Sequence, residues 1–499
     1  MSNSGYFIKS IGWIIISKLT NSIVQFISVP LLLSYFGKLD FSLVVLIMSI
    51  NAYLQLLDFG VNTGAIKYFS EWIKHQNFEK VDSVARTSIS FYGIIGLFNA
   101  LILVVIAFWG QRFFSIDPVQ QLVMQKMLLI MAFFSVINWI TSVFNQLLIA
   151  NENIYILQQI NIFKSLFSFL VIYLTIKLKL SITTYFIWYS IVNAAVIVPL
   201  YLMASKRRFI TSVIPHNDWI GFKEVFKYSV SILAVGIFQM SAVNLRPVVL
   251  SIFTENGIGI VTDYRIMETI TLFVISIGGM LISVFLPKTT KLLIENDHEK
   301  TTAYINKSTL YSSIFSIILC VPFIICSNEI LFLYVGKEYV HLGNWLILWL
   351  LTILLFLHNT PVASLVLSTG KTKMLVISSA ISCCLSIAIN AVLCPLFDSG
   401  SAIIGYLIYI LIQSSFYYLY FNKKVLNLKS FDIFKRFFYP TILGITLAFG
   451  IKWFPITLSN LYLQILIKEA LWFLLFTLLL FSFRLVNIKE LKQLIAFKI

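Results

Sequence analysis

Long hydrophobic runs, separated by short polar segments, fill this chain almost from end to end. Each run has about 18 to 28 residues, and a helix that rises 1.5 Å per residue needs about 20 to cross the hydrocarbon core of a bilayer. The pattern therefore predicts fourteen transmembrane helices. In the first half they cover residues 10–36, 41–60, 88–109, 122–149, 154–178, 182–204 and 228–253. In the second half they cover residues 258–286, 308–326, 342–368, 373–397, 401–421, 437–454 and 461–483.

Basic residues collect on alternate connections. With a cytoplasmic N-terminus, 25 of the 37 lysine and arginine residues fall in the even-numbered loops and at the two termini. Six fall on the opposite side: Lys38, Arg112, Lys177, Lys179, Lys337 and Lys452. Because cytoplasmic loops carry an excess of basic residues, this asymmetry predicts that both termini are cytoplasmic and that the helix count is even.

Composition supports a membrane protein and narrows the choice of partners. The chain is 59% hydrophobic and 12% charged, with a mean hydropathy of +0.90, which soluble domains of this size do not reach. The net charge of +16 is spread over short loops, so topology accounts for it without a nucleic-acid partner. The first run is too long for a signal-peptide core and lacks a cleavage pattern, so we expect it to remain as the first helix.

Parts of the two halves resemble each other at a nearly constant offset. The pattern PxxLSxF occurs at residues 30–36 and again at 247–253, and Glu79–Lys80 is followed 220 residues later by Glu299–Lys300. Repeats of six helices, an even number, enter the membrane from the same side, a plan found in transporters. We therefore predict an all-α polytopic membrane protein with two pseudo-symmetric six-helix lobes and two additional helices. The predicted divisions are residues 1–210, 211–425 and 426–499.

Polar residues recur on one face of several predicted helices. Their spacing is mainly three or four residues, so each set shares a face. The sets are Lys18, Asn21, Gln25 and Ser28; Asn51, Gln55, Asp58 and Asn62; Asn138, Ser142 and Asn145; and Gln158, Asn161, Lys164, Ser165 and Ser168. Such stripes either bond neighbouring helices or line a polar cavity, and spacing alone leaves both interpretations open. The cavity candidates are Asn21, Gln25, Asn51, Gln55, Asn145 and Asn161.

Basic residues within the predicted helices are the strongest candidates for a binding site. A lysine or arginine at mid-membrane costs about 2.5–3.5 kcal/mol, so it normally faces protein or a water-filled cavity. Lys18 and Lys164 have no acidic residue within one turn of their own helices. With Arg246 and Arg265 they are candidates for binding an anionic headgroup, although Arg265 and Glu268 have the spacing of a structural ion pair.

Three acidic residues lie at membrane depth: Asp58, Asp263 and Glu268. Desolvation favours the protonated form of a carboxyl group, so these residues are candidates for ion coupling. A structural role is the alternative for Asp58, either as a helix-end cap or as a partner of Lys67.

No catalytic or metal-binding pattern stands out. Gly370-Lys371-Thr372 ends like a phosphate-binding loop, but the position five before Gly370 is Leu365 and no soluble strand precedes it. The five cysteines lie in or beside hydrophobic runs without a CxxC pattern or a nearby histidine. We therefore expect no enzyme activity, no cofactor and no metal site.

Several segments carry a resemblance to a known family. These segments are Leu56–Gly64 followed by Lys67 and Glu71, Phe285–Lys288, and Asn390–Pro395 followed by Gly400–Gly405. In these motifs, and in length, helix count and orientation, the chain is similar to Wzx-type flippases of the multidrug/oligosaccharidyl-lipid/polysaccharide (MOP) exporter superfamily. It departs from them late in helix seven, where relatives often have an acidic–basic pair and this chain has Asn244 and Arg246.

The resemblance implies a flippase in the bacterial inner membrane. Such a protein moves an undecaprenyl diphosphate-linked, O-antigen-like sugar unit from the cytoplasmic to the outer leaflet by alternating access. Its substrate is a lipid-linked oligosaccharide in contact with the lipid bilayer. A polysaccharide polymerase and a chain-length regulator of polysaccharide or lipopolysaccharide biosynthesis are the candidate protein partners.

Two other functions stay open. A MATE-like ion-coupled drug or cation exporter of the same superfamily would favour an acidic interior and twelve helices, whereas this chain has an excess of buried cations. A membrane enzyme or scaffold of polysaccharide assembly is the second. The enzyme would need a long external loop or an acidic catalytic pair at the membrane surface, and the sequence shows neither.

Overall fold

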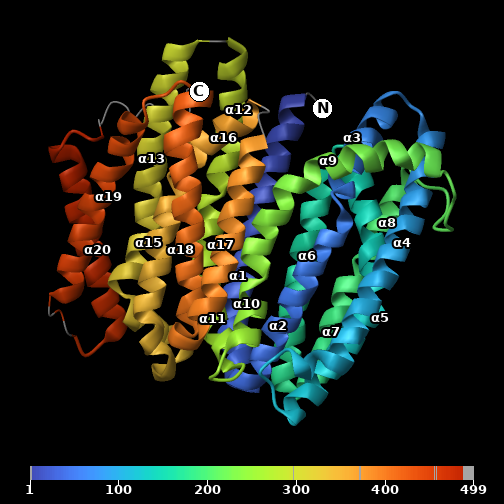
Figure 1. Ribbon diagram of the computed structural model, residues 1–499, viewed down its shortest axis with the longest axis horizontal. Coiled ribbons are helices and arrows are strands. Elements are labelled where there is room, and N and C mark those ends of the chain that lie inside the picture. The colour runs from blue at the N-terminus through green and yellow to red at the C-terminus, as the bar shows by residue number, and fades with distance from the viewer. Residues whose placement is uncertain (1–2, 296, 370–372, 455, 457, 487–499) are drawn as a thin grey trace. The chain divides into compact units, whose positions relative to one another are not determined.

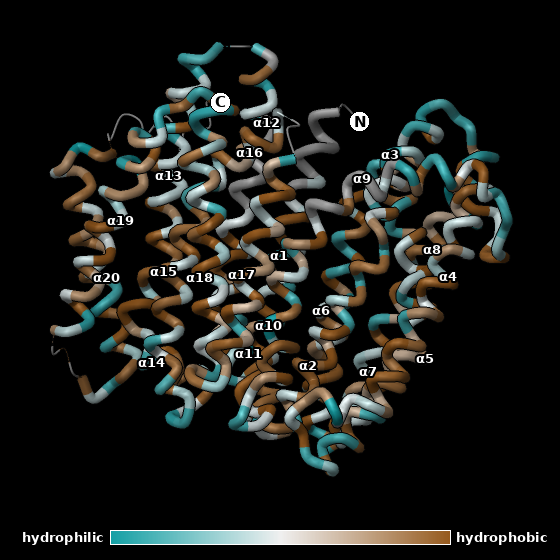
Figure 2. Tube along the Cα trace, in the orientation of Figure 1, coloured by the Kyte–Doolittle hydropathy of each residue, from teal (hydrophilic) through white to brown (hydrophobic). Residues whose placement is uncertain are grey.

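The structure, a computed structural model, describes residues 3–295, 297–369, 373–454, 456 and 458–486. These residues form helices joined by short connections, with no strand among them (Figure 1). The long helices are hydrophobic through much of their length, and hydrophilic residues gather toward their ends and connections (Figure 2). The prediction of an all-α polytopic membrane fold is confirmed. The Gly370-Lys371-Thr372 turn lies outside the described residues.

Grouped by their contacts, the described residues fall into two compact units, each with its own hydrophobic core. Unit 1 comprises the described residues of Met1–Ile266 and Cys383–Ala402. Its first helices are α1 (Asn3–Phe36), α2 (Lys38–Leu54), η1 (Gln55–Asp58), α3 (Val61–Lys74), α4 (Phe78–Trp109) and η2 (Gly110–Arg112). They are followed by α5 (Pro118–Ala150), α6 (Ile154–Lys177), α7 (Ile182–Ala195), α8 (Ile197–Lys206), α9 (Trp219–Asn244) and α10 (Arg246–Phe253). Within this unit α4 runs beside α5, and α1 packs along α6 (Figure 1).

Unit 2 comprises the described residues of Met267–Ser382 and Ile403–Ile499. Three helices contribute residues to both units: α11 (Gly259–Gly278), α17 (Lys373–Phe397) and α18 (Ser399–Phe416). The others of unit 2 are α12 (Met280–Glu295), α13 (His298–Ile325), α14 (Ser327–Val335), η3 (Lys337–Leu342), α15 (Gly343–Leu357), α16 (Thr360–Ser368), η4 (Tyr417–Val425), α19 (Ser430–Trp453) and α20 (Leu461–Ser482). Within it α13 packs against α19 and α15.

Capping side chains set where several helices begin. The first N–H groups of a helix lack intrahelical partners, and a preceding Asp, Asn or Ser side chain accepts hydrogen bonds from them. Asp117 and Gln120 form a reciprocal capping box at the start of α5, with Pro118 as the first helical residue. At the starts of α7 and α9, the side chains of Ser181 and Asp218 accept hydrogen bonds from the backbone N–H groups of Thr184 and Gly221, without the reciprocal bond. Local sequence therefore explains these helix starts.

Among the described residues, eleven helices are long and hydrophobic enough to cross a membrane. The number is twelve if Gly236–Asn244 and Arg246–Phe253, bent by 46°, form one broken span. Pro247 lies at this bend, where it removes a helical donor. The predicted spans 258–286 and 437–454 are not among the twelve. The first is interrupted between α11 and α12, and α19 carries Asp432, Lys435 and Arg436 in its first two turns. The count of fourteen stays a prediction.

Helices in the two halves of the chain begin and end at matching places. α13 begins 220 residues after α4, and both starts are capped alike. Asn77 accepts a hydrogen bond from the backbone N–H of Lys80 at 3.2 Å, and Asp297 accepts one from that of Lys300 at 3.0 Å. α1 and α10 both end at the phenylalanine of the PxxLSxF pattern. These matches support an internal repeat, and the division at residues 210 and 425 stays a prediction.

Candidate functional site

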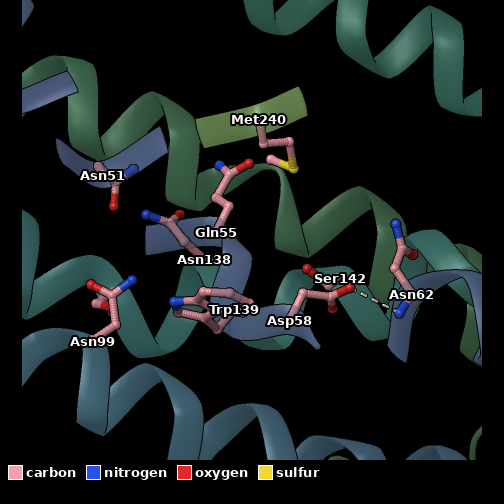
Figure 3. A pocket seen from close by; sticks show the side chains of 10 residues that line it. Asn51, Gln55, Asp58, Asn62, Asn99, Asn138, Trp139, Ser142 and Met240 are labelled. Atoms are coloured by element: carbon pink, nitrogen blue, oxygen red, sulfur yellow. Dashed lines mark hydrogen bonds between the residues drawn. The ribbon is translucent and has the colours of Figure 1, made fainter. Parts of the chain in front are cut away.

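Unit 1 contains a polar cavity of about 320 Å³. Figure 3 shows side chains from α2, η1, α3, α4, α5 and α9 surrounding one space. The lining residues are Asn51, Gln55, Asp58, Asn62, Asn99, Ser135, Asn138, Trp139, Ser142 and Met240. Eight of these ten are polar, and Asp58 is the one charged residue among them. A small-molecule pocket of this size is usually mostly hydrophobic, so this lining indicates a polar ligand.

The cavity forms because the polar faces of two helices meet. Asn51, Gln55, Asp58 and Asn62 follow one another at helical spacing from α2 through η1 into α3. The chain turns between η1 and α3 at Phe59 and Gly60, which both have left-handed backbone angles. α5 contributes a second face, which consists of Ser135, Asn138, Trp139 and Ser142.

Asp58 is held in place by hydrogen bonds from two directions. The hydroxyl of Tyr92 donates to its Oδ1, and the backbone N–H of Asn62 donates to its Oδ2 at 3.1 Å. The Gln146 amide donates in turn to the Tyr92 hydroxyl oxygen at 2.7 Å. Tyr92 and Gln146 are buried, and the Tyr92 ring stacks on Trp139 with centroids 5.9 Å apart. Asp58 therefore caps α3, and a buried network orients its carboxylate at the cavity wall.

Lys18 lies on an exposed polar face of α1. Its side chain and that of Gln25 are exposed on one face, and the exposed Ile16, Ile23 and Ile27 lie on the opposite face at 100° per residue. In a membrane-spanning helix, an exposed hydrophobic face fits lipid, whereas an exposed polar face opposite it fits a water-filled cavity.

Lys164 lies on a polar face of α6. Asn161, Lys164 and Ser168 are half-buried, and the exposed Phe163 and Leu170 lie on the opposite face. The two polar faces meet where the Ser165 hydroxyl donates to Asn21. Lys18 and Lys164 each lie within one turn of that bond, and no ion pair to either lysine occurs among the described residues.

The other charged candidates lie elsewhere. Arg246, at the start of α10, and Glu268, on α11, are buried, and Arg265 of α11 is half-buried. Asp263 forms an ion pair with Lys38 of α2 at 2.8 Å. Neither these four candidates nor Lys38 lines the polar cavity.

The predicted uncharged candidates also lie in different places. Asn51 and Gln55 line the polar cavity together with Asp58. Asn21 and Asn161 lie beside Lys18 and Lys164, and Gln25 is exposed on the polar face of α1. Asn145 is half-buried on α5 and does not line the cavity.

Five residues of this site were not predicted from the sequence: Asn99, Ser135, Tyr92, Trp139 and Gln146. Asn99 and Ser135 interrupt hydrophobic runs, and this signal was available in the sequence. Nothing in the local sequence distinguishes Tyr92, Trp139 and Gln146 from other helix residues. Folding brings them together beside Asp58. Among the described residues, no group of three or more His, Cys, Asp or Glu side chains is arranged to hold a metal ion.

Comparison with solved structures places this arrangement in a known fold. The lipid II flippase MurJ, in an inward closed conformation, aligns with a TM-score of 0.72 at 15% identity, over 94% of this chain and 99% of MurJ. The chain has the fold of MOP superfamily transporters. An inward-facing MATE family transporter of that superfamily, involved in multidrug resistance, has a TM-score of 0.63 at 12% identity, over 88% of this chain and 99% of its own. A eukaryotic MATE transporter has a TM-score of 0.60 at 13% identity, over 87% and 99%. No protein-family model and no curated protein sequence matches the chain.

Proposed function

We propose that this MOP-fold protein is a flippase for a lipid-linked oligosaccharide. It moves an undecaprenyl diphosphate-linked, O-antigen-like repeat unit from the cytoplasmic to the outer leaflet of the bacterial inner membrane by alternating access. The observation that carries the proposal is the pair Lys18 and Lys164. Both lie on polar faces of membrane helices, Lys18 exposed and Lys164 half-buried, with no ion-pair partner among the described residues. The fold shared with the lipid II flippase MurJ supports it.

The two lysines suit an anionic headgroup. Attraction between opposite charges strengthens as the effective dielectric constant falls, so a diphosphate gains most where water is partly excluded. An unpaired lysine at membrane depth is costly, and a bound diphosphate offsets that cost. The polyprenyl tail needs no aqueous path, because it stays in the lipid while the headgroup crosses.

The proposed energy source is an ion gradient or the downstream consumption of the product. Of the three acidic candidates, Asp58 is the one that lines the polar cavity, whereas Asp263 is paired with Lys38. We therefore place ion coupling, if transport is coupled, at Asp58. If transport is unchanged after Asp58→Asn, this residue has no role in coupling.

Proteoliposomes that contain a labelled undecaprenyl diphosphate-linked oligosaccharide test the proposal. We expect protein-dependent translocation between leaflets. Lys18→Ala and Lys164→Ala should each slow it at least about tenfold, because a hydrogen bond to a charged group contributes about 1.5–3 kcal/mol. Lys126→Ala, at an exposed lysine of α5, is the matched control and should transport normally. Translocation that is unaffected in both lysine variants would reject the headgroup site and retain the flippase.

A MATE-like exporter of drugs or cations is the second candidate. Asp58 in the cavity and the likeness to MATE transporters favour it. The same vesicles distinguish the two functions, because cation efflux without movement of the lipid-linked sugar would support the exporter.

A further inference from the structure

The side chains that line the polar cavity suit a more specific ligand than a headgroup passing through. We infer that it is a subsite for one uncharged sugar ring of the oligosaccharide, and that it excludes both acidic sugars and the diphosphate. This inference rests on the proposed function and specifies the substrate class of the protein. It also assigns different parts of the substrate to two sites. The cavity is lined by residues of α2, η1, α3, α4, α5 and α9, whereas Lys18 and Lys164 belong to α1 and α6.

Neutral groups that both donate and accept hydrogen bonds dominate the lining. Asn51, Gln55 and Asn138 supply amides, and Ser142 supplies a hydroxyl. Each amide has two donors and one acceptor oxygen, and each hydroxyl serves as donor and acceptor. Sugar hydroxyl groups have the same dual character, so a sugar ring can satisfy such a lining from many directions. A hydrophobic drug would find few hydrophobic contacts there.

Asn99 gives an independent sign of a ligand. Asn99 is 1% exposed and lines the cavity. Its side-chain Oδ1 has no hydrogen-bond partner among the described residues. Buried polar atoms are nearly always hydrogen-bonded, so one without a partner calls for an explanation. Because Oδ1 is itself buried, a hydroxyl group of a bound sugar supplies the missing donor once the Asn99 amide turns toward the cavity.

Asp58 sets the charge preference. Its carboxylate accepts hydrogen bonds from Tyr92 and from the backbone of Asn62, and among the described residues no lysine or arginine lines the cavity to balance it. Sugar hydroxyls can donate to this acceptor, whereas a uronate or a phosphate brings a second negative charge next to it. Like charges repel strongly where water is partly excluded. The cavity therefore selects against anions.

Binding of free sugars to the full-length protein in lipid nanodiscs tests this inference without requiring transport. The probes are neutral trisaccharides of glucose, galactose and N-acetylglucosamine, each paired with an analogue in which all three rings are uronic acids. We expect a neutral probe to bind, and its acidic analogue to bind about tenfold more weakly or not at all. Asp58→Asn should remove most of this difference.

Two variants and one control assign the binding to the cavity. Asn99→Leu and Asn138→Leu should each weaken binding of the neutral probe about tenfold, because each leaves sugar hydroxyls unpaired. Asn138 is exposed and lines the cavity, so we expect its variant to fold normally. Asn193→Leu on α7 is the control, since the Asn193 amide donates to the backbone of its own helix, and it should bind normally.

The outcomes separate this inference from the proposed function. The subsite is overturned if none of the neutral trisaccharides binds, if neutral and acidic probes bind equally, or if both cavity variants behave like Asn193→Leu. Translocation of the lipid-linked oligosaccharide would still stand in those cases, because it is measured separately. Conversely, sugar binding without translocation would retain the subsite and remove the flippase.

Discussion

At the scale of single residues, two glycines allow α3 to approach α9 closely. Gly60 has a φ of 71° and closes the turn after η1, and Gly64 follows one turn later. A Cβ atom added at Gly60 would lie 2.8 Å from the backbone oxygen of Ser229, and one at Gly64 would lie 2.9 Å from that of Val225. The missing side chains therefore let the two backbones meet at one end of the polar cavity.

Gly64→Ala should destabilise the protein by about 1–3 kcal/mol, because the added methyl group forces packed backbones apart. Gly93→Ala is the matched control, since nothing lies within 4 Å of its added Cβ, and it should leave stability unchanged or slightly raised. Thermal unfolding of the purified variants in detergent measures both effects. Equal melting temperatures for the two variants would contradict the close contact.

At the scale of elements, an ion pair ties α20 to α14 in unit 2. The Lys468 ammonium donates to the Glu329 carboxylate at 2.7 Å, and the Gln464 amide donates to the same oxygen at 3.1 Å. Glu329 lies between two membrane spans, and Lys468 is 5% exposed. Burial acts to raise the pKa of Glu329, but the hydrogen bond from Lys468 and its other hydrogen bonds outweigh it and hold the pKa below its usual value of 4.5.

This lowered pKa predicts how stability depends on pH. A carboxyl group with a lowered pKa in the folded state stabilises the protein above its unfolded pKa, and that stabilisation is lost as the pH falls through the folded value. Wild-type protein should therefore be more stable than Glu329→Gln at pH 7, by about 1–3 kcal/mol for a charged hydrogen bond. The difference should shrink below pH 4.5. A difference in melting temperature that stays constant from pH 7 to pH 3.5 would contradict this role of Glu329.

At the scale of the whole molecule, two polar contacts connect α2 to the first part of α11. Lys38 pairs with Asp263 at 2.8 Å, and the hydroxyls of Ser42 and Thr262 lie 2.7 Å apart. Lys38 belongs to the side predicted to face outward, and its partner Asp263 lies 225 residues away in the chain. Under the proposed alternating access, we expect α2 and the first part of α11 to separate before the oligosaccharide leaves.

A reversible cross-link between α2 and α11 tests that requirement. In the double variant Ser42→Cys with Thr262→Cys, the short distance between the two hydroxyls favours a disulfide. Oxidation should stop translocation in proteoliposomes, and a reducing agent should restore it. The single variant Ser42→Cys controls for the five native cysteines and should be insensitive to oxidation. Full translocation by the cross-linked protein would show that α2 and α11 need not separate.

The sequence by itself determined the membrane helices and much of their polar patterning, because these depend on local hydrophobicity and helical period. Asn51, Gln55 and Asp58 were predicted to share a face, and they line one cavity. Only the tertiary structure decided which partners meet that face. Tyr92 lies 34 residues from Asp58, and no local pattern links them. The same holds for Lys38 and Asp263, because packing of hydrophobic helices, not spacing along the chain, brings such distant polar groups together.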